Sequence, residues 1–263
     1  MKKIIKKSLS LFLALVMLVG IIASTNVFAE GTFEKKVVSD LTAKIEWINS
    51  KVTGNVKFDN IFPKELSNLE EKNPDEYVGK LETSVEAGDL FDGAYKLYKE
   101  KLYERRGPKG YWRNAVMFGE TRDTFPNATY TVNFPENIFV DKENIKAISN
   151  SSTISKIDVS LEDHSVKFTF YLGTWNDYEG FFNLVEKELD SPNHTIDISI
   201  PFTVKANENT SKVLGTVKGN GECKLYKFGI LSPKGPIIDI NSPEVKCEIL
   251  NPINKGGIIW KRD

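Results

Sequence analysis

Apolar and polar residues alternate strictly in four stretches within residues 127–204. Side chains on a β-strand point alternately to opposite faces, so this pattern indicates strands with one buried and one solvated face. Four such strands predict a β-sheet layer with a hydrophobic core. The inward-facing residues are predicted to be Ala128, Tyr130, Val132, Phe134, Ile157, Val159, Leu161, Val166, Phe168, Phe170, Leu172, Ile196, Ile198, Ile200, Phe202 and Val204.

The connection between the third and fourth strands carries a helical pattern. Its apolar face is predicted to consist of Tyr178, Phe181, Phe182, Val185 and Leu189. Asn176 and Glu179 have the spacing of a helix-capping box. A connection that contains a helix can cross from one sheet edge to another or cover the end of a β-sandwich. Pro201 cannot donate a ladder hydrogen bond, so the fourth strand is predicted to be an edge strand or to bulge there.

Residues 63–106 are predicted to be mainly helical. Asn73 followed by Pro74 and two acidic residues is typical of a helix start. Two helical faces follow, one made of Tyr77, Leu81 and Val85 and one of Phe91, Tyr95, Tyr98 and Leu102. The second, aromatic face is predicted to pack against the sheet. Residues 41–48 fit a strand and a helix equally well, and residues 52–58 favour a strand.

Residues 207–263 have the pattern of short strands separated by turns. Strands are predicted at 213–217, 223–228, 237–240 and 245–250, because Gly-rich or Pro-rich segments lie between these runs. This segment contains the two cysteines of the chain, Cys223 and Cys247. In an oxidising compartment two cysteines are most simply interpreted as one disulfide. The sequence therefore predicts a structural disulfide within a small C-terminal β unit.

The N-terminus has the pattern of a secretory signal peptide. Four lysines in residues 2–7 precede an almost wholly apolar run at 9–23, and Ala29 provides a small residue for cleavage. The apolar run is shorter than the roughly 20 residues that a membrane span needs. Cleavage after Ala29 would remove four of the 35 basic residues and none of the 36 acidic ones, leaving a net charge of −5. We therefore predict a secreted or surface-associated chain with no integral membrane span after signal removal.

Catalytic and cofactor motifs are absent from the sequence. The two histidines, His164 and His194, are predicted in a hairpin turn and just before a strand. Neither stands in a zinc-binding pattern, and the chain contains no nucleophile elbow and no glycine-rich nucleotide loop. Carboxylates are abundant, but a sequence does not give the separation that a glycosidase pair requires. The prediction is a non-enzymatic protein with no metal and no cofactor.

The expected function is therefore binding. We predict an adhesin-like interaction module whose partner is an extracellular protein or a glycan; the alternatives are a carbohydrate-binding protein and an accessory module of a glycan-directed hydrolase. A weakly acidic chain is a poor nucleic-acid binder, so no nucleic-acid partner is expected. Trp175, Tyr178 and Trp112 are the candidate ligand-binding residues, because aromatic side chains on loops can stack on sugars or anchor a partner. For Trp175, the sequence favours the alternative role of a hydrophobic staple at the helix start.

The predicted fold class is α+β and mainly β. It combines an antiparallel β-sandwich-like core with an inserted helix, a helical N-terminal segment packed on it, and a small C-terminal β unit. The corresponding division is a signal peptide at 1–29, a mixed or helical region at 30–118, a central β-sandwich-like domain at 119–206 and the C-terminal unit at 207–263.

Overall fold

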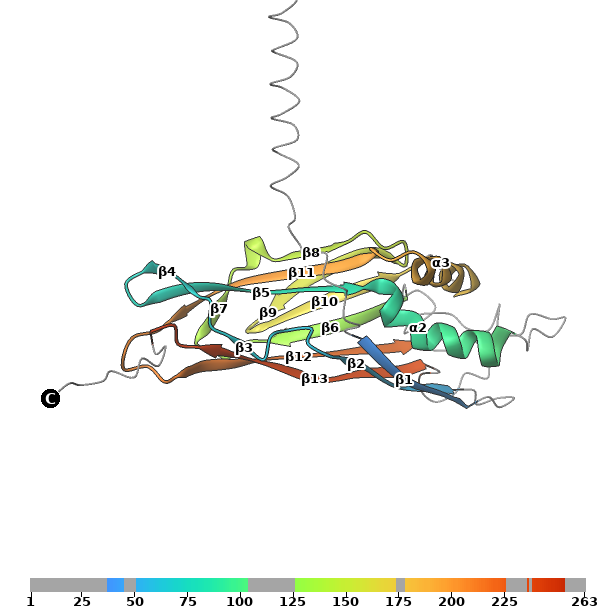
Figure 1. Ribbon diagram of the computed structural model, residues 1–263, viewed down its shortest axis with the longest axis horizontal. Helices are drawn as coiled ribbons and strands as arrows, with labels where there is room; N and C mark the ends of the chain where they lie inside the picture. The colour runs from blue at the N-terminus through green and yellow to red at the C-terminus, as the bar shows by residue number, and fades with distance from the viewer. Residues whose placement is uncertain are drawn as a thin grey trace, which may run out of the picture. The chain divides into compact units, whose positions relative to one another are not determined.

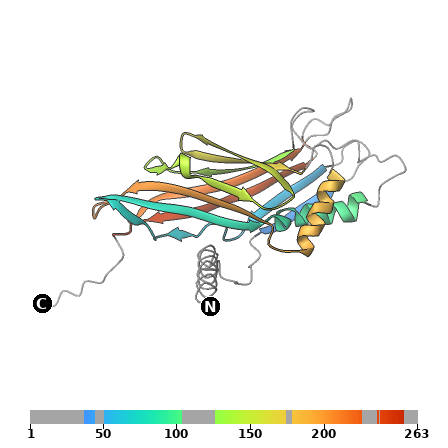
Figure 2. The ribbon, with the colours of Figure 1, turned by 90° about the horizontal axis from the view of Figure 1, so that it is seen from above.

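The computed structural model describes residues 37–44, 51–103, 126–173, 178–225, 236 and 238–253. All of them belong to one compact unit, Lys35–Asp263. Two β-sheets and two helices make up most of this unit, and both views show the helices side by side at one end of the sheets (Figures 1 and 2). The predicted fold class, mainly β with a sandwich-like core and an inserted helix, is confirmed.

Among the described residues, the larger sheet has eight strands. Seven follow one another across it in the order β1 (Val37–Lys44), β2 (Lys51–Phe58), β13 (Ile238–Leu250), β12 (Val213–Leu225), β6 (Asn127–Asn133), β10 (Ser165–Leu172) and β9 (Ile154–Glu162). The short β3 (Glu65–Leu66) also pairs with β13. Neighbouring strands are antiparallel except where β2 and β3 run parallel to β13.

The smaller sheet has five strands in the part of the chain that the structure describes. Four follow one another in the order β4 (Glu70–Asn73), β5 (Glu76–Glu86), β11 (Thr195–Lys205) and β7 (Ile138–Val140). The fifth, β8 (Lys146–Ser149), also pairs with β11, so β7 and β8 follow one another along the same side of that strand. A short 3-10 helix, η2 (Lys142–Asn144), lies between β7 and β8 in the chain.

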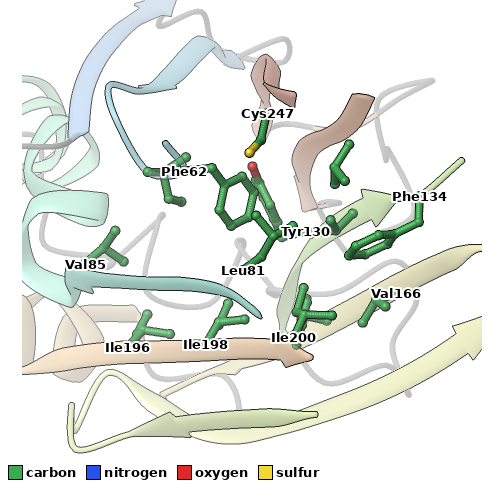
Figure 3. Close-up of a cluster of buried hydrophobic side chains, with 14 of the residues drawn as sticks. Phe62, Leu81, Val85, Tyr130, Phe134, Val166, Ile196, Ile198, Ile200 and Cys247 are labelled. Carbon is green, nitrogen blue, oxygen red and sulfur yellow. The ribbon is translucent and has the colours of Figure 1, made fainter. Parts of the chain in front are cut away.

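The hydrophobic core lies between the inner faces of the two sheets. Figure 3 shows Ile196, Ile198 and Ile200 of β11 pointing into this space, with Tyr130 and Val166 on the strands of the larger sheet. The side chains that are completely or almost completely buried come from both sheets and include Leu81, Val132, Val166, Phe168, Ile200, Phe202, Val204, Val217, Cys247 and Ile249. Burial of apolar surface is the main favourable contribution to folding.

Aromatic side chains join the two helices, α2 (Ala87–Leu97) and α3 (Tyr178–Asp190). The rings of Phe91 and Phe181 meet edge to face with centroids 5.0 Å apart. Tyr98, in the π-helical turn η1 (Tyr98–Tyr103) that continues α2, stacks on Phe182 with centroids 4.5 Å apart. The predicted helical aromatic stripe is therefore confirmed for its described side chains, and its partner is largely α3. Helix α2 also packs on β1.

The prediction that a helix starts at Asn73 is wrong. Residues 70–86 form a β-hairpin in which Asn73 pairs with Glu76, and Asp75 in the turn has a φ of 62°. Tyr77, Leu81 and Val85 are four residues apart, a spacing that one face of a strand shares with one face of a helix. Gly79 and Thr83 occupy the remaining inward positions, and because neither is large and apolar, they obscured the two-residue alternation.

The ambiguous stretch at 41–48 is a strand as far as it is described, because β1 extends to Lys44. β1 pairs with β2 along its whole length, and this confirms the strand expected at 52–58. The local pattern did not distinguish a strand from a helix here, and the pairing with β2 shows that the described part is a strand.

The four alternating strands are all present, but they do not form one sheet. β6, β9 and β10 are neighbours in the larger sheet, and β11 belongs to the smaller one. The connection that contains α3 crosses from β10 in the larger sheet to β11 in the smaller one. Crossing between sheet edges was one of the two roles expected of this connection. Pro201 is not on an edge strand either: β11 has partners on both sides, and Pro201 lies opposite the gap between β7 and β8. Its carbonyl accepts a hydrogen bond from Asp141 N at 2.9 Å in that gap.

The four short C-terminal strands are in fact two strands of 13 residues, β12 and β13, with a register shift between Gly219 and Gly221. The glycines that suggested a turn allow a close approach. A Cβ on Gly219 would lie 2.5 Å from the hydroxyl of Tyr130 on β6. Glycine here makes room for a core tyrosine and does not end the strand.

The larger sheet contains strands from all three regions that were predicted for the chain after the signal peptide, with boundaries at 118/119 and 206/207. β13 from the C-terminal segment lies between β2 from the N-terminal segment and β12, and β12 pairs in turn with β6 from the central segment. Backbone hydrogen bonds thus cross both proposed boundaries, because a long strand satisfies its polar groups only with a partner on each side.

Candidate functional site

Two of the three predicted ligand-binding residues, Trp112 and Trp175, lie outside the described residues. Tyr178 is the first residue of α3, and its side chain is also outside the description. Their role in binding therefore stays a prediction. The two histidine positions are as expected: His164 lies in the two-residue turn between β9 and β10, and His194 immediately precedes β11.

The predicted disulfide between Cys223 and Cys247 is wrong, because both cysteines are free thiols. Cys247 points into the core, but it lies opposite Val217 on β12. Cys223 is six residues further along that strand, which corresponds to about 20 Å at roughly 3.3 Å per residue. A disulfide requires Cα atoms within about 7 Å of each other. The prediction failed because it interpreted two long strands as four short ones.

Both thiols are expected to be present and unreactive in the native protein. Burial raises the pKa of the Cys223 thiol to about 12 and that of Cys247 to about 11, with Glu222 and Glu248 as smaller causes. The reactive thiolate is therefore scarce at pH 8. Unreduced, denatured protein should give two thiols per chain with a chromogenic thiol reagent, and native protein should react much more slowly. A denatured sample that shows thiols only after reduction would contradict this assignment.

The outer face of the smaller sheet carries the two most exposed large hydrophobic side chains among the described residues. Ile148 on β8 is 62% exposed and Phe139 on β7 is 57% exposed. They lie opposite Asp197 and Thr203 of β11, whose neighbours Ile196, Ile198, Phe202 and Val204 point into the core. Residues directly opposite one another in a ladder share a face, so Phe139 and Ile148 both point outward. We call the surface around them the β7–β8 face.

Charged side chains lie on the same sheet as these two apolar residues. Lys80 and Glu82 of β5, Lys146 of β8 and Asp197 of β11 are all exposed on the smaller sheet. Glu82 accepts a hydrogen bond from Ser199 at 3.2 Å, so part of this polar network is already ordered. Large apolar side chains within a charged rim are the composition expected of a protein-binding surface.

A partly open cavity of about 160 Å³ lies between the two sheets, near α2 and α3. Its lining is almost entirely apolar and comes from both sheets and both helices; Val56, Val85, Phe91, Ile154, Leu172 and Phe181 are examples.

Two buried hydroxyls lie on residues that line the cavity and have no hydrogen-bond partner among the described residues. They are Thr83 Oγ1 on β5 and the phenol oxygen of Tyr130 on β6. Burial raises the pKa of Tyr130, so its hydroxyl stays protonated at neutral pH. An unpaired buried hydroxyl is costly, and each such group in a native structure requires an explanation.

A buried carboxylate holds α3 against the loop between β8 and β9. Glu188 is 4% exposed. Its oxygens accept hydrogen bonds from Ser152 N at 2.7 Å, Ser152 Oγ at 2.8 Å and Ser151 Oγ at 2.8 Å. Among the described residues, no cation contributes to these contacts, and the donors all come from one loop. Because every one of them is a hydrogen bond within the fold, we assign Glu188 a structural role.

The part of the chain that the structure describes contains no group of three or more His, Cys, Asp or Glu side chains placed to hold a metal ion. Within the same residues, no helix has the length and apolar character needed to cross a membrane.

Comparison with family models and with curated proteins finds no match to this chain. Among solved structures, the collagen-binding subdomain of the Enterococcus faecalis surface protein ACE matches with 10% identity and a TM-score of 0.29, covering 73% of this chain and 97% of that one. The collagen-binding domain from a Staphylococcus aureus adhesin gives 6% identity, a TM-score of 0.27 and coverages of 72% and 97%.

A 35 kDa C-terminal fragment of the major pilin GBS80 of Streptococcus agalactiae matches with 12% identity and a TM-score of 0.30, covering 81% of this chain and 56% of that one. Identities and TM-scores this low carry no inference about function. Residues of this chain must therefore support any functional assignment.

Proposed function

We propose that this chain is a secreted, cell-surface-associated binding module of the adhesin type, without catalytic activity, and that its β7–β8 face binds an extracellular protein. The observation that carries the proposal is the outward orientation of Phe139 and Ile148 on one face of one sheet. The signal-peptide pattern ending at Ala29 supports the extracellular location.

The dimensions of the β7–β8 face suit a single protein interface. The β11 residues opposite Phe139 and Ile148 are six positions apart, so the two side chains are separated by about 20 Å along the strand. A standard interface buries about 800 Å² on each partner, which corresponds to a patch roughly 30 Å across. Both anchors fit within one such patch, and the β-sheet beneath them holds them rigidly before binding.

The energetics favour a protein partner. Burying a Phe or Ile side chain that was exposed gains about 1.5–3 kcal/mol, and hot-spot residues contribute most of the affinity of a typical interface. Charged neighbours such as Lys80, Glu82 and Lys146 would form the rim, where they set orientation and association rate more than affinity. A sugar ligand, by contrast, would need stacking aromatics together with convergent polar groups.

The test is solid-phase binding of the purified secreted chain to a panel of immobilised extracellular-matrix proteins, collagen included, and to a glycan array. We expect saturable binding to a protein on the panel, and we expect Phe139→Ser and Ile148→Ser each to raise the Kd at least about tenfold. Val38→Ser is the matched control, since Val38 is 45% exposed but lies on the larger sheet. Equal loss of binding in all three variants would contradict the proposal.

Binding to glycans alone would instead favour the second candidate, a carbohydrate-binding protein. Its candidate residues are Trp175, Tyr178 and Trp112. Trp175→Ala is then expected to weaken glycan binding by more than about 1 kcal/mol without lowering the melting temperature. Early melting with unchanged binding per folded molecule would assign Trp175 to the hydrophobic staple.

A further inference from the structure

We propose that the cavity between the two sheets binds a small apolar molecule of about the size of benzene or phenol, carrying one hydrogen-bonding group that meets Thr83. This site is separate from the β7–β8 face, because Phe139 and Ile148 do not line the cavity. The inference therefore stands independently of the proposed function.

The size and lining of the cavity define the class of ligand. A volume of about 160 Å³ is close to that of an engineered apolar cavity of about 150 Å³ that binds benzene. Side chains from α2, α3 and both sheets line it, among them Leu90, Phe91, Phe181 and Ile196. A long acyl chain or a sugar would be too large or too polar, so a single ring or a short branched alkyl group fits best.

Water is a poor occupant of this space. The cavity is large enough for several water molecules, and each buried water typically makes about three hydrogen bonds. The lining surface offers almost no polar area. Water molecules in this cavity find few hydrogen-bond partners on the protein, whereas an apolar ring gains contact with the surrounding side chains.

Thr83 supplies the polar contact. Its side chain lines the cavity, the residue is 9% exposed, and Oγ1 has no hydrogen-bond partner among the described residues. The hydroxyl of Tyr130 is also unpaired, but it lies over Gly219, which is not part of the lining. A ligand hydroxyl near Thr83 would therefore satisfy the buried Oγ1, both by donating and by accepting a hydrogen bond.

The test compares phenol with benzene, two probes of similar size that differ by one hydroxyl, by isothermal titration and by chemical-shift changes in the full secreted chain. We expect saturable binding of both, with phenol at least about fivefold tighter. Thr83→Val should abolish that preference and retain benzene binding. The matched control Thr203→Val, on the outer face of β11, should leave both affinities unchanged.

A cavity-filling variant tests the location. Ala94→Leu on α2 places a larger side chain in the lining, and we expect it to abolish binding of both probes while the circular dichroism spectrum stays native. If Ala94→Leu does not fold, Ala128→Val on β6 serves the same purpose with a smaller change. The proposal is overturned by absence of saturable binding to the wild-type chain at millimolar probe, by undiminished binding in the filled variant, or by a phenol preference that survives Thr83→Val.

Discussion

Replacing Glu188 by alanine is expected to lower the free energy of unfolding by about 3 kcal/mol. The substitution removes the acceptor of Ser151 Oγ, Ser152 N and Ser152 Oγ. Ser151 is buried, and an unsatisfied buried donor costs about 1–3 kcal/mol, whereas each of the two hydrogen bonds lost at the exposed Ser152 costs about 0.5–1 kcal/mol because water replaces the acceptor. Chemical denaturation monitored by circular dichroism measures the loss. The effect should be concentrated at the contact between α3 and the β8–β9 loop.

Glu186 provides the matched control on the same helix. Its side chain is 42% exposed and its only described ion pair, with Lys99, is at the surface. Glu186→Ala should therefore cause a much smaller loss than Glu188→Ala, because exposed pairs are screened by solvent. Equal losses from the two substitutions would show that the hydrogen bonds to Glu188 do not stabilise the fold as the structure indicates.

Phe202→Ala is expected to cost about 3–5 kcal/mol, and Phe139→Ala less than about 0.5 kcal/mol. The two residues lie on neighbouring strands, but Phe202 is 1% exposed in the core and Phe139 is 57% exposed on the outer face. The same denaturation measurement on both variants compares the two faces of the smaller sheet directly. A large loss for Phe139→Ala would show that this side chain is buried, and the β7–β8 face would lose its main anchor.

The sequence predicts the fold best where large apolar residues alternate without interruption. In β11, Ile196, Ile198, Ile200 and Phe202 leave no other interpretation, and all four are buried. The pattern does not say which sheet a strand joins, because that depends on partners far away in the chain. β11 pairs with β5, more than 100 residues earlier, in register from Thr195 opposite Glu86 to Lys205 opposite Glu76.

Prediction failed where one residue type serves two different purposes. Pro74 and Asp75 start helices and also form hairpin turns, and the local sequence does not distinguish the two. Closely spaced glycines commonly mark turns, whereas Gly219 and Gly221 allow Tyr130 to approach β12. The error about these glycines divided a long strand and placed Cys223 and Cys247 close enough for a disulfide that the structure does not contain.

The sequence alone predicted little of the two candidate sites, the β7–β8 face and the cavity. Ile138, Phe139 and Val140 form an apolar run, and only their pairing with β11 shows that Ile138 is buried and Phe139 exposed. The cavity depends on side chains from seven or more segments, and Thr83 looks like an ordinary strand threonine until its surroundings are known.

The measurement that most directly tests the central claim is hydrogen–deuterium exchange of the secreted chain with and without the protein partner found on the binding panel. Binding at the β7–β8 face should slow exchange of the amides in residues 138–149, where β7 and β8 form the edge of the smaller sheet. Peptides from β1 and β2, at the far edge of the larger sheet, should be unchanged. Protection confined to β1 and β2, or to the outer face of the larger sheet, would contradict the account.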